Sequence, residues 1–351
     1  MNGKRIVIFG WASSVHIQRW CRALRDKGWT IRLISLGGEK LDNIDTIIFP
    51  RESQLSYFKY AEQAAQKANE FEPDLIHVHY VGGFGIWGMK TKFKPTVVSV
   101  WGSDIVTQAQ KFHYRLFIKQ SLKRADHITS SSEFLKEQTI KLTKKAQDKI
   151  SMIPFGVNLP DLQPLPEQTP LKLCFIKGHR SIYGPEFLLK ALARAKKQIP
   201  EIKLTFAGEG EITDQLKALT QQLDLVHNVE FAGFIPNEKM AEFITAHHIM
   251  VMPSLQESFG VAALETSACA RPVIATTVGG IPEVVEHGKT GLLISPQDEK
   301  ALAEAIVKLG SDFDLIQKMG ESGRQFVSDN FQWEKNVNSM VELYERLINE
   351  K

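Results

Sequence analysis

The stretch His248-Ile-Met-Val-Met-Pro-Ser-Leu-Gln-Glu-Ser-Phe-Gly-Val-Ala-Ala-Leu-Glu265 decides how this chain folds. Residues 248–252 form an apolar run of the length and composition of a buried strand, and Pro253 ends it. Residues 261–270 are rich in alanine and other small or apolar residues, as expected of a helix packed on a sheet. The pattern therefore predicts a strand, a short loop and a helix, in that order.

The expected start of this helix offers a site for an anion. Ser258 or Glu257 stands where an N-cap is expected, and Gly260 keeps the turn narrow. The amides around Phe259, Gly260 and Val261 would then lack partners within the helix, and such first-turn amides bind phosphate groups well. The sequence thus predicts a phosphate site between the strand and the helix.

Two acids flank this site, Glu257 in the loop and Glu265 inside the helix. A carboxylate beside a phosphate has a use when it accepts hydrogen bonds from neutral hydroxyl groups, and sugar hydroxyls are such groups. The spacing therefore indicates a phosphate bonded to sugars on both sides. The same spacing also fits an ordinary strand–loop–helix joint with two surface acids.

The length and composition of the chain are those of a globular protein with two domains. Its 351 residues exceed one ordinary domain, and 43% of them are hydrophobic and 24% charged. No apolar run approaches the roughly 20 residues that span a bilayer, and residues 1–10 resemble a first strand rather than a signal peptide. Three widely spaced cysteines in apolar surroundings, Cys21, Cys174 and Cys269, indicate buried thiols and a cytoplasmic protein.

Charge is divided unequally between the two halves of the chain. Residues 1–160 carry 24 Lys and Arg against 14 Asp and Glu, a balance of +10, and residues 161–351 carry 19 against 26, a balance of −7. A basic surface attracts anions such as the phosphates of a membrane or of a lipid-linked molecule, although unequal halves can also serve to hold two domains together. Nucleic acid fits poorly because neither a stacking platform nor a recognition helix accompanies the charge.

Strand-like and helix-like runs alternate along the chain with short turns between them, which predicts parallel βαβ units. A proline-rich stretch, residues 154–170, has the composition of a linker. We therefore expect an α/β fold of two Rossmann-like, doubly wound domains, residues 1–160 and 161–332, with the helix 333–351 packing back on the first. A ligand is expected in the cleft between them, at the carboxyl ends of both sheets. Gly82, Gly83 and Gly85 are expected to form a flexible loop after the strand 73–79.

At this point several motifs resemble one family, the retaining glycosyltransferases of family 4, which have the GT-B fold. Glu257 and Glu265 lie in its Pro-Ser-x-x-Glu-Ser-Phe-Gly pattern. The other matching segments are residues 279–283, 287–293, 206–210 and 153–157, and in the first half residues 16–20, 73–79 and 101–104. The resemblance covers nearly the whole chain, and the specificity comes from the order of the motifs. It implies transfer of a hexose-type sugar from a nucleoside-diphosphate sugar to a hydroxyl acceptor in polysaccharide, glycolipid or glycan assembly.

The resemblance implies a donor site in the second domain. Glu265 would hold the ribose hydroxyls and Glu257 the hydroxyls of the transferred sugar. The residues that would offer the sugar and the distal phosphate their backbone groups are Ser258, Phe259, Gly260 and Val261. The donor would be a UDP-, GDP- or ADP-sugar.

Lys177 would neutralise the diphosphate leaving group, with Arg180 and His179 beside it. The family usually has a second cation, a lysine, directly before the glycine that corresponds to Gly184, and here Tyr183 stands in its place. Loops around Gly208 and Phe234 would complete the donor site. The resemblance also implies attack from the side of the leaving group, with a departing phosphate oxygen taking the acceptor's proton. No metal ion or other cofactor is then expected, because Lys177 and the helix amides do the work of a metal.

Loops after the strands of the first domain would face the acceptor. The candidates are Ser13, His16, His79, Trp101 and Asp104, and Trp101 stands where the family commonly has histidine. Each of the two histidines fits a hydrogen-bonded structural residue equally well, and Asp104 fits a residue that caps a helix or orients the loop.

Three further readings remain open from the sequence. The basic segment 111–124 mixes cations with aromatic and aliphatic residues, so it either lies on an anionic membrane at the inner face or packs its apolar face on the sheet. A sugar-nucleotide 2-epimerase or hydrolase shares the two-domain frame. A degenerate sugar-nucleotide-binding subunit would explain Trp101 and Tyr183.

Overall fold

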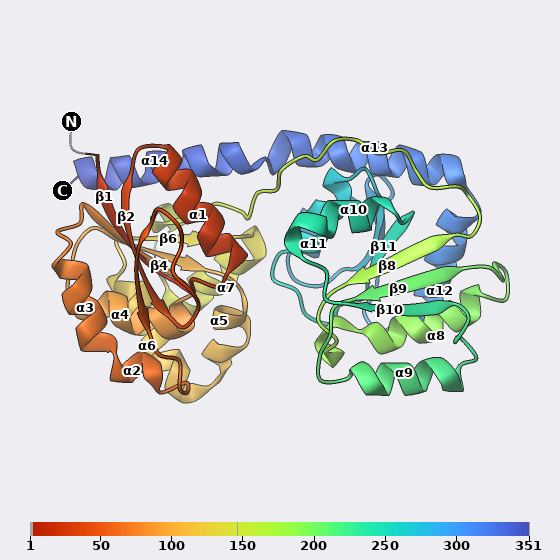
Figure 1. Cartoon of the computed structure of the whole chain (residues 1–351), viewed down its shortest axis with the longest axis horizontal. Helices are drawn as coiled ribbons and strands as arrows, with labels where there is room; N and C mark the ends of the chain where they lie inside the picture. Colours follow the sequence, from red (N-terminus) through yellow and green to blue (C-terminus); the bar gives the residue numbers. More distant parts are fainter. Residues whose placement is uncertain (1–2, 146, 351) are drawn as a thin grey trace. The chain divides into compact units, whose positions relative to one another are not determined.

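The computed structural model of the chain describes residues 3–145 and 147–350. The chain divides into two compact units, whose elements are labelled and coloured by residue number in Figure 1. Unit 1 comprises Met1–Phe155 with Glu334–Lys351, and unit 2 comprises Gly156–Trp333. Both units are built on parallel sheets with helices between successive strands, which confirms the α/β fold of two Rossmann-like lobes.

Unit 1 has a seven-stranded sheet in the order β3-β2-β1-β4-β5-β6-β7, with parallel neighbours. Its strands are β1 (Arg5–Phe9), β2 (Thr30–Leu36), β3 (Asp45–Phe49), β4 (Leu75–His79), β5 (Thr96–Val100), β6 (His127–Ser130) and β7 (Ile150–Met152). Its α-helices are α1 (Val15–Asp26), α2 (Ser56–Lys59), α3 (Ala61–Asn69), α4 (Val81–Thr91), α5 (Ser103–Val106), α6 (Phe112–Arg124), α7 (Glu133–Thr143) and, apart from its first residue, α14 (Trp333–Asn349).

Unit 2 has a six-stranded sheet in the order β10-β9-β8-β11-β12-β13, again with parallel neighbours. Its strands are β8 (Lys172–Ile176), β9 (Lys203–Ala207), β10 (Val229–Gly233), β11 (Ile249–Met252), β12 (Val273–Thr276) and β13 (Gly291–Ile294). Its α-helices are α8 (Pro185–Ala195), α9 (Thr213–Gln222), α10 (Met240–Thr245), α11 (Val261–Ala268), α12 (Glu299–Gly310) and α13 (Phe313–Asn330).

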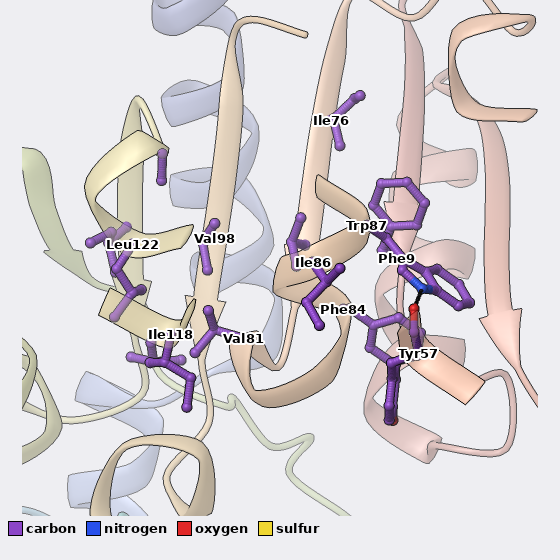
Figure 2. Packing of buried hydrophobic residues seen from close by; sticks show 14 of the residues in the cluster. Phe9, Tyr57, Ile76, Val81, Phe84, Ile86, Trp87, Val98, Ile118 and Leu122 are labelled. Carbon is purple, nitrogen blue, oxygen red and sulfur yellow. Dashed lines mark hydrogen bonds between the residues drawn. The ribbon is translucent and has the colours of Figure 1, made fainter. Parts of the chain in front are cut away.

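The central strands of unit 1 are buried along their whole length. Every residue of β4 and β5 is buried, because helices cover both faces of a parallel sheet. Phe9, Tyr57, Phe84 and Trp87 pack together in this core, as Figure 2 shows. The indole Nε1 of Trp87 donates to the carbonyl oxygen of Tyr57 at 2.7 Å, so the largest buried side chain leaves no polar atom unpaired.

The flexible loop expected at Gly82, Gly83 and Gly85 is wrong, because these residues belong to the buried helix α4. A Cβ on Gly83 would lie 2.5 Å from the ring of Tyr57, and one on Gly85 would lie 2.7 Å from Ser121 Oγ. The glycines therefore serve close packing of α4 against its neighbours. Packing outweighs the roughly 1 kcal/mol that a glycine costs inside a helix.

Helix α13 is not among the helices expected from the sequence. Its start is clear in the structure, where Asp312 Oδ1 accepts a hydrogen bond from the Leu315 amide at 2.9 Å. Two internal glycines weaken its helical pattern, yet a Cβ on Gly320 would lie 2.2 Å from the carbonyl oxygen of Ala270. As in α4, the glycine allows a close approach that the sequence pattern alone does not reveal.

The proline-rich stretch is fastened to unit 2 rather than free. Arg324 Nη2 donates to the carbonyl oxygen of Pro160 at 2.8 Å, and Arg271 Nη2 donates to that of Pro164 at 2.6 Å. Unit 1 ends at Phe155, within this stretch. The boundary between the units thus lies in the predicted linker, and its later residues, 160–170, form a strap on unit 2.

Candidate functional site

The loop between β11 and α11 is shaped by Gly260. This residue has a φ of 104°, in the left-handed region that favours glycine, and it occupies the N-cap position. A Cβ here would also lie 3.0 Å from Val284 Cγ2. The prediction of Ser258 or Glu257 as the cap is therefore wrong, since the turn that starts α11 comes later and needs a residue without a side chain.

The amides expected to bind an anion lie at this helix start. The Gly260 carbonyl oxygen accepts from the Ala263 and Leu264 amides at 3.0 and 3.2 Å. The amides of Gly260 and Val261 precede these bonds and belong to the end of the helix, where N–H groups and the helix dipole favour negative charge. The predicted phosphate site lies at this helix start and stays a prediction.

The two candidate catalytic residues meet directly. Lys177, which follows β8, places Nζ 2.6 Å from Glu257 Oε2, and their side chains are only 19% and 13% exposed. The other Glu257 oxygen accepts from the Ser258 amide at 3.2 Å. The predicted phosphate-binding cation and the predicted sugar-binding acid therefore neutralise each other.

Tyr183 gives Lys177 a second contact that the sequence did not reveal. The Lys177 Nζ lies 5.1 Å from the centroid of the Tyr183 ring, within the range of a cation–π interaction. The ammonium group is thus held by a carboxylate and an aromatic ring together. The position of Tyr183 before Gly184 was visible in the sequence, but the face that its ring turns to Lys177 depends on the fold.

The loops that carry these residues are packed closely on one another. The Leu255 amide donates to the Ile182 carbonyl oxygen at 2.8 Å, which ties the β11 loop to the β8 loop. Gly208 has a φ of 107°, and a Cβ there would lie 2.5 Å from the Lys177 carbonyl oxygen. Gly208 therefore lies beside the Lys177 backbone, in a conformation and at a distance that exclude larger residues.

The remaining donor candidates differ in exposure. The Phe259 side chain is 2% exposed and packs on Phe331, so it anchors the loop, and only its backbone can face a ligand. Glu265 is partly buried on α11, one turn after Val261, and both fit a ligand at the start of the helix. Phe234 is 76% exposed at the end of β10, a position open to a flat apolar group.

The two expected helpers of Lys177 are not equivalent. Arg180 is 54% exposed and its Nε lies 3.7 Å from Glu211 Oε1, so it remains free to reorient. His179 is fully buried, with Nδ1 2.9 Å from Thr213 Oγ1, and burial lowers its pKa. His179 is therefore a buried structural residue, which corrects its expected role as a helper of Lys177.

In unit 1 the aromatic acceptor candidates gather at the carboxyl ends of the strands. The ring of Trp101 lies 5.7 Å from that of His16 and 5.7 Å from that of His79, measured between centroids. The ring of Phe155 lies 4.4 Å from that of His16, tilted by 33°. Burial lowers the pKa of His16 to about 4, with the Arg19 charge adding to the effect. Ser13 is exposed in the loop between β1 and α1.

His79 is the most deeply buried histidine of this cluster, with 1% of its surface exposed. Neither of its ring nitrogens, nor the buried hydroxyl of Ser131, bonds to another described atom. Both residues line a cavity of about 10 Å³, which also includes Thr129 and Trp101. This volume is close to the minimum for one water molecule, and the lining is polar enough to hold it. His79 therefore packs against the ring of Trp101, and its burial excludes direct contact with an acceptor.

Asp104 has the loop-orienting role rather than the acceptor-binding one. It is fully buried, and its carboxylate accepts hydrogen bonds from the amides of Val81, Trp101, Gly102 and Ile105, at 2.8 to 3.1 Å. Burial raises its pKa to about 6, against these hydrogen bonds, which lower it. Asp104 thus fixes the loop that carries Trp101 and presents no oxygen to solvent.

Replacing His79 by phenylalanine is expected to flatten the pH dependence of stability. Burial lowers the pKa of His79 from 6.5 to about 3. Between these values the unfolded chain binds a proton that the folded chain does not, so this group makes stability rise with pH, by up to about 1.4 kcal/mol per pH unit. Urea unfolding of both proteins from about pH 4 to 7.5 measures the slope. The exposed His227→Phe exchange should leave it unchanged, and an unchanged slope in His79→Phe would contradict the assignment.

Larger cavities lie elsewhere in both units. Those of about 400, 430 and 590 Å³ are lined by residues near the amino ends of the strands, such as Thr96, Pro95 and Lys203, and by none of the candidates. Within the described residues, no group of three or more His, Cys, Asp or Glu is arranged to hold a metal ion. No helix there has the length and apolarity needed to cross a membrane.

Comparison with known proteins follows the same division of the chain. Residues 162–326 match the family model of the glycosyl transferases group 1, and residues 5–132 match that of a glycosyl transferase 4-like family. An uncharacterized glycosyltransferase of Methanocaldococcus jannaschii is 30% identical over 303 residues, which cover 84% of this chain and 81% of the relative.

Solved structures of similar fold cover nearly the whole chain. Sucrose-phosphate synthase from Thermosynechococcus elongatus matches with a TM-score of 0.87 and 24% identity, over 99% of this chain and all of that one. Anabaena HepE, solved in complex with UDP and glucose, matches with a TM-score of 0.83 and 18% identity, over 97% and 99% of the two chains. At these identities the likeness shows the fold, which is that of the GT-B glycosyltransferases.

Proposed function

The chain belongs to the glycosyl transferases of group 1, and on that premise we propose that it is a retaining enzyme using a nucleoside-diphosphate sugar. It moves a hexose-type sugar to a hydroxyl acceptor in the assembly of surface polysaccharide, glycolipid or glycan. The observation that carries the proposal is the Lys177–Glu257 pair beside the start of α11. A cation, helix amides and an acid then converge where a diphosphate joins a sugar.

Donor binding exchanges the partners of this pair. The distal phosphate takes Lys177 and the amides of Gly260 and Val261, and Glu257 is released to accept hydrogen bonds from the transferred sugar. Glu265, one turn further along α11, accepts the ribose hydroxyls. Glu257 can therefore bind the sugar only after a phosphate has taken its place beside Lys177. The diphosphate and the sugar should thus bind cooperatively.

The reaction that fits these groups needs no dedicated base. The acceptor oxygen attacks the anomeric carbon from the side of the leaving group, and the bond from that carbon to the phosphate oxygen breaks. The departing phosphate oxygen takes the acceptor proton, so charge and protons balance without another residue. Lys177 and the α11 amides stabilise the phosphate as its charge develops.

The acceptor and the location belong to the same proposal. Ser13, His16 and Trp101 would contact a glycan or lipid-linked acceptor, with Trp101 stacking on a sugar face rather than moving a proton. The enzyme would work in the cytoplasm, at the inner face of the membrane, through the basic unit 1. Support for a nucleotide donor comes from HepE, which was solved with UDP and glucose.

The test is a thermal-shift panel of UDP-, GDP- and ADP-sugars, followed by turnover with the matching donor. We expect one nucleotide class to stabilise the protein with or without chelator. Glu265→Ala should weaken donor binding roughly 10- to 100-fold, because charge-assisted hydrogen bonds contribute about 1.5–3 kcal/mol. Glu321→Ala, an exposed acid on α13, is the matched control.

Other outcomes would assign a different function. Unchanged donor affinity in Glu265→Ala would contradict the role of Glu265 in binding the ribose. A strict requirement for a divalent metal would contradict the metal-independent mechanism. Release of free sugar or of epimerised donor without acceptor identifies a hydrolase or 2-epimerase. Donor binding without turnover on any acceptor identifies a binding subunit.

A further inference from the structure

Helix α6 turns two large apolar side chains to solvent. Ile118 and Leu122 are buried and define the face that packs on the unit 1 core. Phe112 and Leu116 lie on the opposite face and are 76% and 58% exposed. The core therefore does not account for them, although the sequence allowed all the apolar residues of this segment to pack inward.

Cations continue the same exposed face. Lys119 and Lys123 follow Leu116 at spacings of three and seven residues, which places them in line with Phe112 and Leu116 along the helix. The segment 111–124 contains five Lys and Arg and no acid. None of these five side chains forms an ion pair with a described residue.

Helix α2 and Leu55, the residue before it, extend the apolar part of this surface. Leu55 and Phe58 are 72% and 54% exposed, and the ring of Phe58 lies 6.0 Å from that of Phe117 on α6. Figure 1 shows both helices at the same end of unit 1. We call Leu55, Phe58, Phe112 and Leu116, with the α6 cations, the α2–α6 patch. It holds four of the nine large hydrophobic residues that are exposed in the described chain.

We propose that the α2–α6 patch binds the surface of an anionic lipid bilayer. Apolar side chains on a helix face insert among headgroups and acyl chains, and neighbouring Lys and Arg pair with lipid phosphates. Residues 1–160, which contain the patch, carry an excess of ten positive charges, in agreement with an anionic partner. A second copy of the chain fits less well, because a self-complementary contact would bring two sets of unpaired cations together.

This inference rests on the proposed function in one respect: membrane binding would bring the acceptor-binding unit to a lipid-linked acceptor. The surface itself is argued from its side chains. The patch lies in unit 1, and the donor site lies in unit 2. Vesicle binding and donor binding can therefore be measured separately on the full chain.

The experiment is co-sedimentation of the protein with vesicles of phosphatidylcholine alone or with about 30% phosphatidylglycerol. We expect binding to the anionic vesicles only, with an affinity that falls as salt rises. The double variants Phe112→Ser/Leu116→Ser and Lys119→Glu/Lys123→Glu should each bind at least tenfold more weakly. The matched controls, exposed residues of unit 2, are Val226→Ser and Lys308→Glu/Lys318→Glu, which should bind as the wild type does.

Thermal-shift measurement with the matching donor shows whether each variant is folded and keeps its donor site. Equal binding to both kinds of vesicle, or wild-type binding by both patch variants, overturns the inference. A third outcome also overturns the inference: the wild type binds no vesicles and is a dimer, and the Phe112→Ser/Leu116→Ser variant is a monomer. The patch would then contact a second copy of the chain. In each case a normal donor shift leaves the proposed function intact, whereas a wild type that binds vesicles but no donor contradicts the proposed function alone.

Discussion

Replacing Lys177 by methionine is expected to lower kcat/KM for sugar transfer by about 10²- to 10³-fold, the usual cost of removing one group that stabilises a leaving anion. Methionine keeps much of the stem of the side chain and removes its charge. Arg180 does not occupy the place of Lys177, since it is 54% exposed and its Nε lies 3.7 Å from Glu211 Oε1. Because the phosphate charge grows as the bond breaks, kcat should fall more than the KM for donor rises.

A double variant separates this effect from the lost ion pair. In Lys177→Met the Glu257 carboxylate, 13% exposed, loses its partner, which should also reduce stability. Lys177→Met/Glu257→Gln should recover that stability in urea unfolding without recovering transfer. Lys190→Met, which removes an exposed cation from the same unit, is the control and should keep wild-type kcat/KM. Transfer at the wild-type rate by Lys177→Met would remove Lys177 from the leaving-group site.

The fold could be predicted because local sequence and packing agree along most of the chain. The buried run at residues 75–79 and the alternation of strands with helices require little more than the periodicity of burial. The prediction failed at α4 and α13, where glycines that look like loop signals allow close packing against Tyr57 and Ala270. Which atoms a glycine will face is decided by segments distant in the sequence, so a local pattern cannot reveal it.

The candidate site shows the same limit. The family resemblance assigned Lys177 and Glu257 to one donor site, and the structure brings them into contact at the ends of the neighbouring strands β8 and β11. The sequence left open whether Asp104 orients the loop or contacts the acceptor, and the four backbone amides that Asp104 binds decide for the loop. It did not reveal that His79 is buried. Strand order brings residues to one edge of a sheet, but the path of each loop decides which side chains face solvent.

Replacing Arg271 by methionine is expected to lower the free energy of unfolding of unit 2 by about 3–5 kcal/mol, because buried carbonyl groups left unpaired cost about 1–3 kcal/mol each before relaxation. Arg271 is 2% exposed. Its guanidinium donates to the carbonyl oxygens of six residues, Gln163, Pro164, Thr245, His247, Cys269 and Ala270. Burial lowers the pKa of Arg271 from its usual range. None of the described acids forms an ion pair with Arg271, so its charge is stabilised by the carbonyl dipoles.

Two of these carbonyls lie in the strap, which gives the variant a local consequence as well. Without Arg271, residues 160–170 should become sensitive to proteases at denaturant concentrations that leave the wild type intact. Arg271→Lys keeps a charge but has only three donors on one nitrogen, so it should fall between wild type and methionine. Urea unfolding and limited proteolysis measure the two effects, with the exposed Arg194→Met as control. A loss of less than about 1 kcal/mol would mean that water replaces the guanidinium at these carbonyls, and the strap would then be held mainly by Arg324.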